Sequence, residues 1–197
     1  MTRIIAGFAG SLTLAVPRFG TRPTSDRVRE AIFSALDAQD ALRDARVLDL
    51  YAGSGALGLE AASRGARAVT LVEKSHGATQ LCRKNAEAVL RAAPTRKSVS
   101  IRVTGQPVQA FLAGSPSRFD VIFLDPPYDL GEVELARNLT ALAPILAEDA
   151  TVVVERDSRS PEPTWGDALQ LTRRKDYGDT AVWYATAAAL PPYSSSH

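Results

Sequence analysis

The sequence predicts an α/β fold with a mostly parallel sheet, helices on both of its faces and a closing antiparallel hairpin. From residue 46 onward, runs that are apolar on both faces alternate with segments of helix length. Such runs are typical of the strands of a parallel sheet that helices cover on both sides. The last two runs follow each other without a helix between them, which predicts the hairpin.

A small hairpin and a helix are expected before this alternation. Two short apolar runs separated by a Gly-Ser pair predict the hairpin within residues 4–16. The segment 22–36 predicts the helix, because Thr24 or Ser25 can cap it and Asp26 complements its positive end. We expect this extension, residues 1–44, to pack on the main domain.

The main domain is expected to span residues 45–188. Its predicted elements are strand 46–52, helix 55–65, strand 67–75, helix 76–93, strand 98–104, helix 107–114, strand 119–125, helix 133–146, strand 150–156 and the hairpin strands 169–178 and 180–188. The predicted sheet therefore has seven strands. Residues 189–197 carry no apolar pattern, and we expect a disordered tail there.

The charge of the chain restricts its function only loosely. Its 197 residues include 23 Lys and Arg against 22 Asp and Glu, so the net charge of +1 does not indicate a strongly basic nucleic-acid-binding chain. The first 29 residues are locally cationic, with one acid and with arginines at positions 3, 18, 22, 27 and 29. This arm is a candidate phosphate-binding surface.

Residue counts also bear on metals and location. A single cysteine, Cys82, excludes an internal disulfide, and with only two histidines no metal site is predicted. Glycine and hydroxyl residues interrupt the apolar amino-terminal stretch, and no clear cleavage site precedes Pro17, which argues against a signal peptide. No segment approaches the length of a membrane span. We therefore predict a cytoplasmic protein without a membrane partner.

The segment DLYAGSGALG, residues 49–58, follows the first predicted strand and opens a helix. Its glycines have the G-x-G-x-x-G spacing, which lets a ligand lie against bare backbone beside a helix amino terminus. Dehydrogenases and methyltransferases share this spacing. Asp49 suits the cationic amino acid part of S-adenosylmethionine better than a pyrophosphate, and Glu73, after the second strand, suits a ribose diol.

The segment DPPY, residues 125–128, ends the fourth strand of the main domain at the same sheet edge. Pro127 has no N–H beside the Pro126 carbonyl, so this carbonyl and the Asp125 carboxylate are two acceptors for one amino group. Tyr128 offers a flat face for a base. The turn therefore indicates alignment of an exocyclic base amine for attack on a methyl group, without a metal.

These motifs resemble a known family. D-x-Y-A-G-S-G-x-L-G with a later D-P-P-Y is shared by many class I S-adenosylmethionine-dependent methyltransferases that act on amines of adenine or guanine. The segment RPTSDRVREAIFSAL, residues 22–36, is similar to a hallmark of the RsmD family, the bacterial 16S ribosomal RNA guanine-N2 methyltransferases. RIIAG at 3–7 and KDYGDTAVWYA at 175–185 also resemble that family, so the similarity spans residues 3–187.

The resemblance implies a Rossmann-like class I methyltransferase fold and methyl transfer from S-adenosylmethionine to N2 of a guanine in 16S rRNA, guanine 966. It implies the small ribosomal subunit or its assembly intermediate as partner, and we expect a monomer. The cofactor site would comprise Asp49, Tyr51, Gly53, Ser54, Gly55 and Glu73. The guanine would be held by Asp125, Pro126, Pro127 and Tyr128. RNA contact or closure over the site would involve Arg22, Thr24, Arg27 and Arg29.

Two features depart from the family pattern. After the third strand, where methyltransferases often place an acid near the adenine amine, the chain has Thr104-Gly105-Gln106. Gln106 or a backbone group is therefore expected to serve. The first hairpin has AGSLTL where relatives often have Arg or Lys, which weakens its expected hold on RNA.

Three alternatives stay open. An adenine-N6 methyltransferase acting on DNA or RNA could use the same tetrapeptide, although the chain has no evident base-reading domain and duplex DNA requires base flipping. A nicotinamide-dependent oxidoreductase could use the glycine turn, but it leaves DPPY unexplained. A noncatalytic RNA-binding module could have kept the fold.

Overall fold

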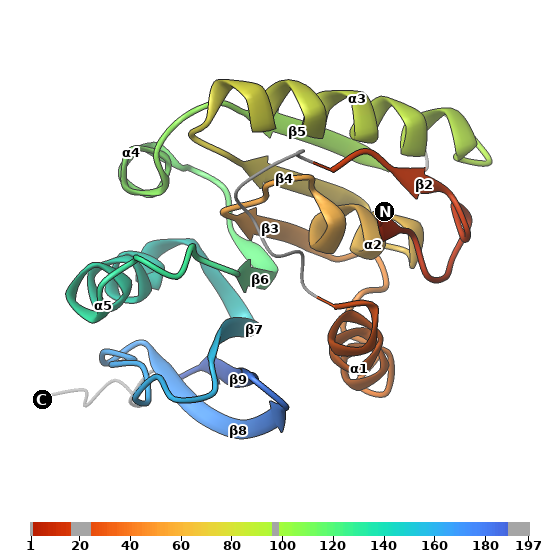
Figure 1. The fold of residues 1–197 in the computed structure, drawn as a ribbon. Helices are drawn as coiled ribbons and strands as arrows, with labels where there is room; N and C mark the ends of the chain where they lie inside the picture. The colour runs from red at the N-terminus through yellow and green to blue at the C-terminus, as the bar shows by residue number, and fades with distance from the viewer. Residues whose placement is uncertain (1, 17–24, 96–98, 189–197) are drawn as a thin grey trace, which may run out of the picture.

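The centre of the structure, a computed structural model, is a sheet of seven strands within the described residues 2–16, 25–95 and 99–188 (Figure 1). From one edge to the other, the strands are β5 Ser100–Thr104, β4 Ala68–Val72, β3 Arg46–Leu50, β6 Phe119–Leu124, β7 Leu146–Asp157, β9 Thr180–Ala187 and β8 Leu169–Tyr177. The first five run parallel, and β9 is antiparallel to both β7 and β8. The predicted mostly parallel sheet with a closing hairpin is confirmed.

Helices cover both faces of the sheet, as predicted. One apolar core joins the sheet to α1 Asp26–Asp37, α2 Ala56–Ser63 and α3 His76–Ala92, and the other joins it to α4 Val108–Gly114 and α5 Glu132–Ala141. Along β6, Val121 and Phe123 belong to the first core, whereas Ile122 and Leu124 belong to the second. This alternation explains why the strand is apolar at successive positions. No helix of the described chain has the length and apolarity needed to cross a bilayer.

The amino-terminal segment adds a short ribbon and α1 to the first core. β1 Thr2–Arg3 pairs antiparallel with β2 Thr13–Leu14, so a hairpin is present, but its strands have two residues each and the first precedes the predicted range 4–16. Ser25 caps α1 by accepting a hydrogen bond from the Val28 amide at 3.2 Å. The buried side chain of Ile32 in α1 belongs to the same core as Val47 of β3. The division between 1–44 and 45–188 stays a proposal, and the expected tail, 189–197, lies outside the described residues.

The predicted helix 133–146 is too long. α5 ends at Ala141, a short 3-10 helix, η1, covers Ala143–Ile145, and β7 begins at Leu146. Pro144 has no N–H to donate to the preceding turn, and its ring clashes with the carbonyl four residues earlier. The α-helix therefore ends before the proline although the apolar pattern continues.

Glu60 of α2 ties the amino-terminal segment to the main domain. Its side chain has no exposed surface, and its carboxylate accepts hydrogen bonds from the Ile5 and Ala6 amides at 2.6 and 3.0 Å. It also pairs with Arg64 Nε at 2.7 Å, and Arg64 reaches Asp37 of α1. A buried carboxylate needs such partners, because its desolvation is costly when it is unpaired.

We expect Glu60→Ala to lower the free energy of unfolding by about 3 kcal/mol, because two amides and a largely buried Arg64 guanidinium lose an anionic partner. Urea unfolding at neutral pH measures the change. The control is Glu87→Ala, which removes an exposed partner of Arg91 on α3 and should cost less than about 1 kcal/mol. Equal costs for the two variants would contradict the structural role of Glu60.

Candidate active site

A cavity of about 620 Å³ lies at the carboxyl ends of the parallel strands. It brings together most of the residues that the sequence predicted for the cofactor and for the base: Asp49, Tyr51, Gly53, Ser54, Glu73, Asp125, Pro126, Pro127 and Tyr128. β3 and β6 pair in parallel, with Asp49 opposite Phe123 and Leu50 opposite Leu124. The turns that follow these two strands are therefore neighbours at the point where the strand order reverses.

The glycine turn needs its glycines for two different reasons. Gly55 adopts a φ of +83°, which favours glycine, and a Cβ there would lie 3.0 Å from Cys82 Sγ of α3. At Gly58 a Cβ would lie 2.3 Å from Leu71 Cδ2, so only glycine lets α2 approach β4 this closely. Gly55 therefore packs against α3 and is not among the described residues that line the cavity, whereas the neighbouring Gly53 lines it.

Asp49 forms the floor of the cavity and is 1% exposed. Burial raises the pKa of its carboxyl group to about 7, and the charges of Asp125 and Glu73 also raise it. The Gly58 amide, which donates a hydrogen bond to Oδ2 at 2.9 Å, lowers this pKa and so compensates part of the shift. Three carboxylates thus share one cavity wall. This arrangement is complementary to a ligand that carries positive charge.

Glu73, directly after β4, is fixed against the glycine turn. Its Oε2 accepts a hydrogen bond from the Gly53 amide at 3.0 Å, and its Oε1 accepts one from the Ser75 amide at 2.7 Å. Each carboxylate oxygen has a second lone pair. The group is therefore oriented and still able to accept from two further donors, such as a pair of vicinal hydroxyls.

Tyr51 is held by a residue that sequence reasoning missed. Its hydroxyl oxygen accepts a hydrogen bond from Asn138 Nδ2 of α5 at 2.6 Å. Burial, with the charge of Glu134, raises the pKa of the Tyr51 hydroxyl to about 12. Nothing in the local sequence around Asn138 points to this contact, because it joins residues 87 positions apart.

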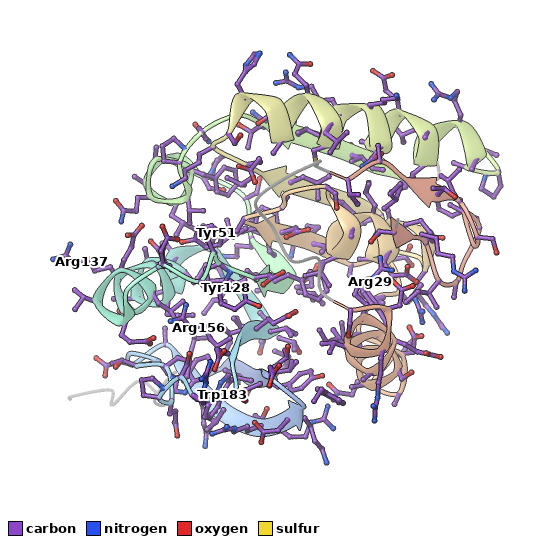
Figure 2. All side chains as sticks on the ribbon, in the orientation of Figure 1. Arg29, Tyr51, Tyr128, Arg137, Arg156 and Trp183 are labelled. Carbon is purple, nitrogen blue, oxygen red and sulfur yellow. The ribbon has the colours of Figure 1, made fainter. Side chains whose placement is uncertain are left out.

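A second missed residue supports the DPPY turn. Arg156 of β7 has a side chain 7% exposed, and its Nη2 donates to the Leu130 carbonyl at 3.2 Å and pairs with the Glu132 carboxylate. The Leu130 amide in turn donates to the Pro127 carbonyl at 3.0 Å. The turn is thus held at its far end, while the ring of Tyr128 stays 70% exposed. Figure 2 shows Tyr51, Tyr128 and Arg156 on the α5 side of the molecule.

Two predicted site residues are corrected. Gln106 is not among the described residues that line the cavity, whereas Pro107, Val108 and Gln109 at the start of α4 are. Arg29 is fully buried, and its Nη2 donates to the Arg3 carbonyl at 2.8 Å and to Asp26 Oδ1 at 2.7 Å. The Arg29 side chain thus joins α1 to β1 and has no exposed surface that could contact RNA.

The other residues predicted to contact RNA have different outcomes. Arg27 is exposed on α1. Arg22 and Thr24 lie outside the described residues. The RNA contact of Arg27 therefore stays a prediction, and the exposure of its side chain is compatible with it.

Comparison with known proteins identifies the family. The model of a family described as Conserved hypothetical protein 95 matches residues 2–186. The chain belongs to this family. It is 38% identical over 180 residues, 91% of this chain and 86% of its relative, to the Escherichia coli K12 protein named ribosomal RNA small subunit methyltransferase D. The RsmD resemblance inferred from the sequence motifs is thereby confirmed.

Solved structures confirm the Rossmann-like methyltransferase fold. The structure of yhhF from Escherichia coli is similar with a TM-score of 0.81 and 36% identity, and the match covers 96% of this chain and 99% of that one. Magnesium protoporphyrin IX methyltransferase from Synechocystis PCC 6803, solved with bound S-adenosylmethionine, has a TM-score of 0.64 at 13% identity, over 86% and 87% of the two chains. At that identity the second match shows the shared fold alone.

Replacing Arg156 should loosen the DPPY turn. Arg156→Ala removes the donor to the Leu130 carbonyl and the partner of Glu132, so we expect the amides of residues 128–132 to exchange with deuterium at least about tenfold faster. Hydrogen exchange read by mass spectrometry measures this. Arg137→Ala, on the outer face of α5 (Figure 2), is the control and should leave exchange in the turn unchanged. Unaltered exchange in Arg156→Ala would contradict the supporting role.

Proposed function

We propose that this protein transfers a methyl group from S-adenosylmethionine to the exocyclic N2 of a guanine in 16S rRNA, guanine 966, within an assembled small ribosomal subunit. The observation that carries the proposal is the single cavity in which the glycine turn with Asp49 and Glu73 meets the DPPY turn. Family membership supports the substrate, because the relative described above is named a ribosomal RNA small subunit methyltransferase. The nicotinamide alternative does not account for the acidic wall or for DPPY.

The cavity suits S-adenosylmethionine on two grounds. Its carboxylates at Asp49, Glu73 and Asp125 complement the positive charges of a sulfonium and an ammonium group, and Glu73 can accept from the ribose hydroxyls. Val72 and Val108 give an apolar wall for the adenine, with Gln109 as a candidate partner for its amine. The bound cofactor would supply a methyl carbon joined to a good leaving group, so the protein needs only to align the nucleophile.

The DPPY turn would align the guanine. The Asp125 carboxylate and the Pro126 carbonyl would each accept one hydrogen of the amine, because Pro127 places no competing N–H beside them. Accepting both hydrogens directs the nitrogen lone pair out of the ring plane. A base stacked on Tyr128 gains about 1 to 3 kcal/mol. Asp125 or water then takes the proton that the methylated nitrogen releases.

Within this proposal, the exposed Arg27, together with Arg22 and Thr24, would contact the RNA around the site. A net charge of only +1 gives weak attraction for naked RNA, which favours a preassembled ribonucleoprotein particle as the substrate. We propose that the protein acts as a monomer. The exocyclic amine of adenine could be held by the same acceptors, so the product must be identified chemically.

Methyl transfer should depend on Asp125 and on the ring of Tyr128. We expect Asp125→Ala and Tyr128→Ala to lower the rate of labelling of unmethylated small subunits about 100-fold or more, because a misaligned amine attacks poorly. Tyr128→Phe keeps the flat face and should retain most of the activity. Nucleoside analysis of the labelled RNA should yield N2-methylguanosine. N6-methyladenosine, or full activity of Asp125→Ala, would overturn the proposed function.

Binding of S-adenosylmethionine should weaken as the pH falls below about 7. The Asp49 carboxyl group, whose pKa is raised to about 7, must be ionised to attract a cation, and below that pH it becomes neutral. We expect the dissociation constant to rise up to about tenfold per pH unit between pH 7 and pH 5, because one proton must be displaced on binding. Calorimetric titration measures this dependence.

Asp49→Asn is the control for this titration. The variant should bind more weakly at pH 7, and its dissociation constant should change little between pH 5 and pH 7. The α-amino group of the ligand stays largely protonated over this range, so it does not produce the trend. An equally steep pH dependence in the variant would show that another group titrates.

A further inference from the structure

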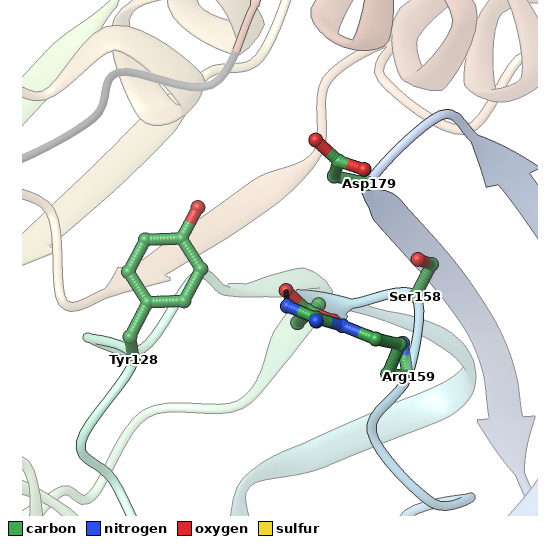
Figure 3. A pocket seen from close by; sticks show the side chains of 5 residues that line it. Tyr128, Ser158, Arg159 and Asp179 are labelled. Carbon is green, nitrogen blue, oxygen red and sulfur yellow. Dashed lines mark hydrogen bonds and ion pairs between the residues drawn. The ribbon is translucent and has the colours of Figure 1, made fainter.

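A second hollow adjoins the cavity at Tyr128. It has a volume of about 590 Å³ and is lined by Tyr128, Asp157, Ser158, Arg159 and Asp179 (Figure 3). Tyr128 and Asp157 also line the cavity that holds Asp125. The two hollows are therefore adjacent, and the exposed Tyr128 lines both of them. We call this second hollow the outer pocket.

Arg159 presents a fixed flat surface to the outer pocket. Its side chain is 88% exposed, yet its Nε and Nη2 donate to the two carboxylate oxygens of Asp157 at 3.0 and 3.2 Å. The Arg159 amide donates to Asp157 Oδ1 at 2.9 Å, and the Ser160 amide donates to the Asp157 carbonyl at 2.9 Å. Two-point pairing of this kind orients a guanidinium plane. Figure 3 shows the Arg159 side chain extending toward Tyr128, with the guanidinium nearest to the ring.

The charges around Arg159 select against an anion. Asp157 is bound to the guanidinium, and Asp179 lines the same pocket; the hydrogen bond and charge of Asp157, with a smaller contribution from the charge of Asp179, raise the pKa of Arg159. A phosphate in the outer pocket would meet these two carboxylates together with one guanidinium already engaged by Asp157. A neutral, flat group avoids this repulsion. It can also contact both the ring of Tyr128 and the guanidinium plane of Arg159.

We propose that the outer pocket binds the nucleobase next to the target guanine, stacked on the guanidinium plane of Arg159 and in contact with the ring of Tyr128. The inference rests on the proposed function, because a guanine held inside the cavity has left the base stack. Its neighbour on the strand then loses one of its stacking partners and would lie near the mouth of the cavity. Bases splayed out of an RNA strand are commonly stacked on aromatic rings and on arginine planes. Any of the four bases can take this position, because each has a flat face.

A stacking probe tests this pocket without requiring catalysis. The probe is a short single-stranded RNA with one guanine and the fluorescent base 2-aminopurine on its 3′ side, and a second probe has it on the 5′ side. We expect the native protein to quench one of the two probes, and Arg159→Ala to raise its dissociation constant about tenfold and to lose most of the quenching. No quenching of either probe at saturation, or undiminished quenching by Arg159→Ala, would overturn the proposal.

Two further variants separate stacking from charge and from folding. Arg159→Lys keeps the charge but loses the plane, and we expect it to behave like Arg159→Ala; recovery of binding, with a salt dependence that tracks the charge, would show a phosphate contact instead. Arg43→Ala, which removes another exposed arginine paired with an aspartate, Asp40, is the control and should match the native protein.

The same variants distinguish this inference from the proposed function. We expect Arg159→Ala to raise the concentration of small subunits needed for half-maximal methylation about tenfold, with the maximal rate changed less than twofold. An inactive native protein would overturn the proposed function, while the quenching experiment would still decide the outer pocket. An active native protein with an unaffected Arg159→Ala variant would overturn the outer pocket alone.

Discussion

The parallel pairing of β3 with β6 is the constraint on which the rest of the site depends. These strands are far apart in the sequence, and their registered pairing places the glycine turn beside the DPPY turn. Either turn alone could be an ordinary loop after a strand. Together they line a cavity that contains the carboxylates of Asp49, Glu73 and Asp125 beside the two prolines of DPPY, which suits the proposed methyl transfer to an amine.

The acidic wall brings like charges together inside the cavity. Asp49 is buried beside two other carboxylates, and the Gly58 amide compensates only part of the cost of ionising it. A ligand that brings positive charge would relieve this repulsion, so the cavity gains affinity from the same feature that costs stability. The amides of Gly53 and Gly58 donate hydrogen bonds to Glu73 and Asp49, and Gly53 also lines the cavity.

Support for the cavity comes from the carboxyl-terminal half of the chain. Asn138 of α5 holds Tyr51, and Arg156 of β7 holds the end of the DPPY turn. Beyond that turn, the segment after β7 supplies Arg159 to the outer pocket. The carboxyl-terminal strands therefore do more than close the sheet, because they position the residues around Tyr128 on which the target base and its neighbour would stack.

By itself, the sequence determined the order of the elements and the two motifs. A strand apolar on both faces, a glycine spacing before a helix and two prolines after a strand have local physical causes, so they can be read without a structure. Whether the other predicted site residues reach the site depends instead on how distant segments pack. The family resemblance predicts that Arg29 contacts RNA or closes over the site, yet Arg29 is buried and donates to the Arg3 carbonyl of β1.

Tertiary structure likewise decided which residues line and support the cavity. Gln109, at the start of α4, lines the cavity, and Arg156 of β7 donates to the Leu130 carbonyl after the DPPY turn. Local propensity carries no information about a partner that is tens of residues away. Which polar side chain is buried, and against what, is fixed only when distant segments pack together.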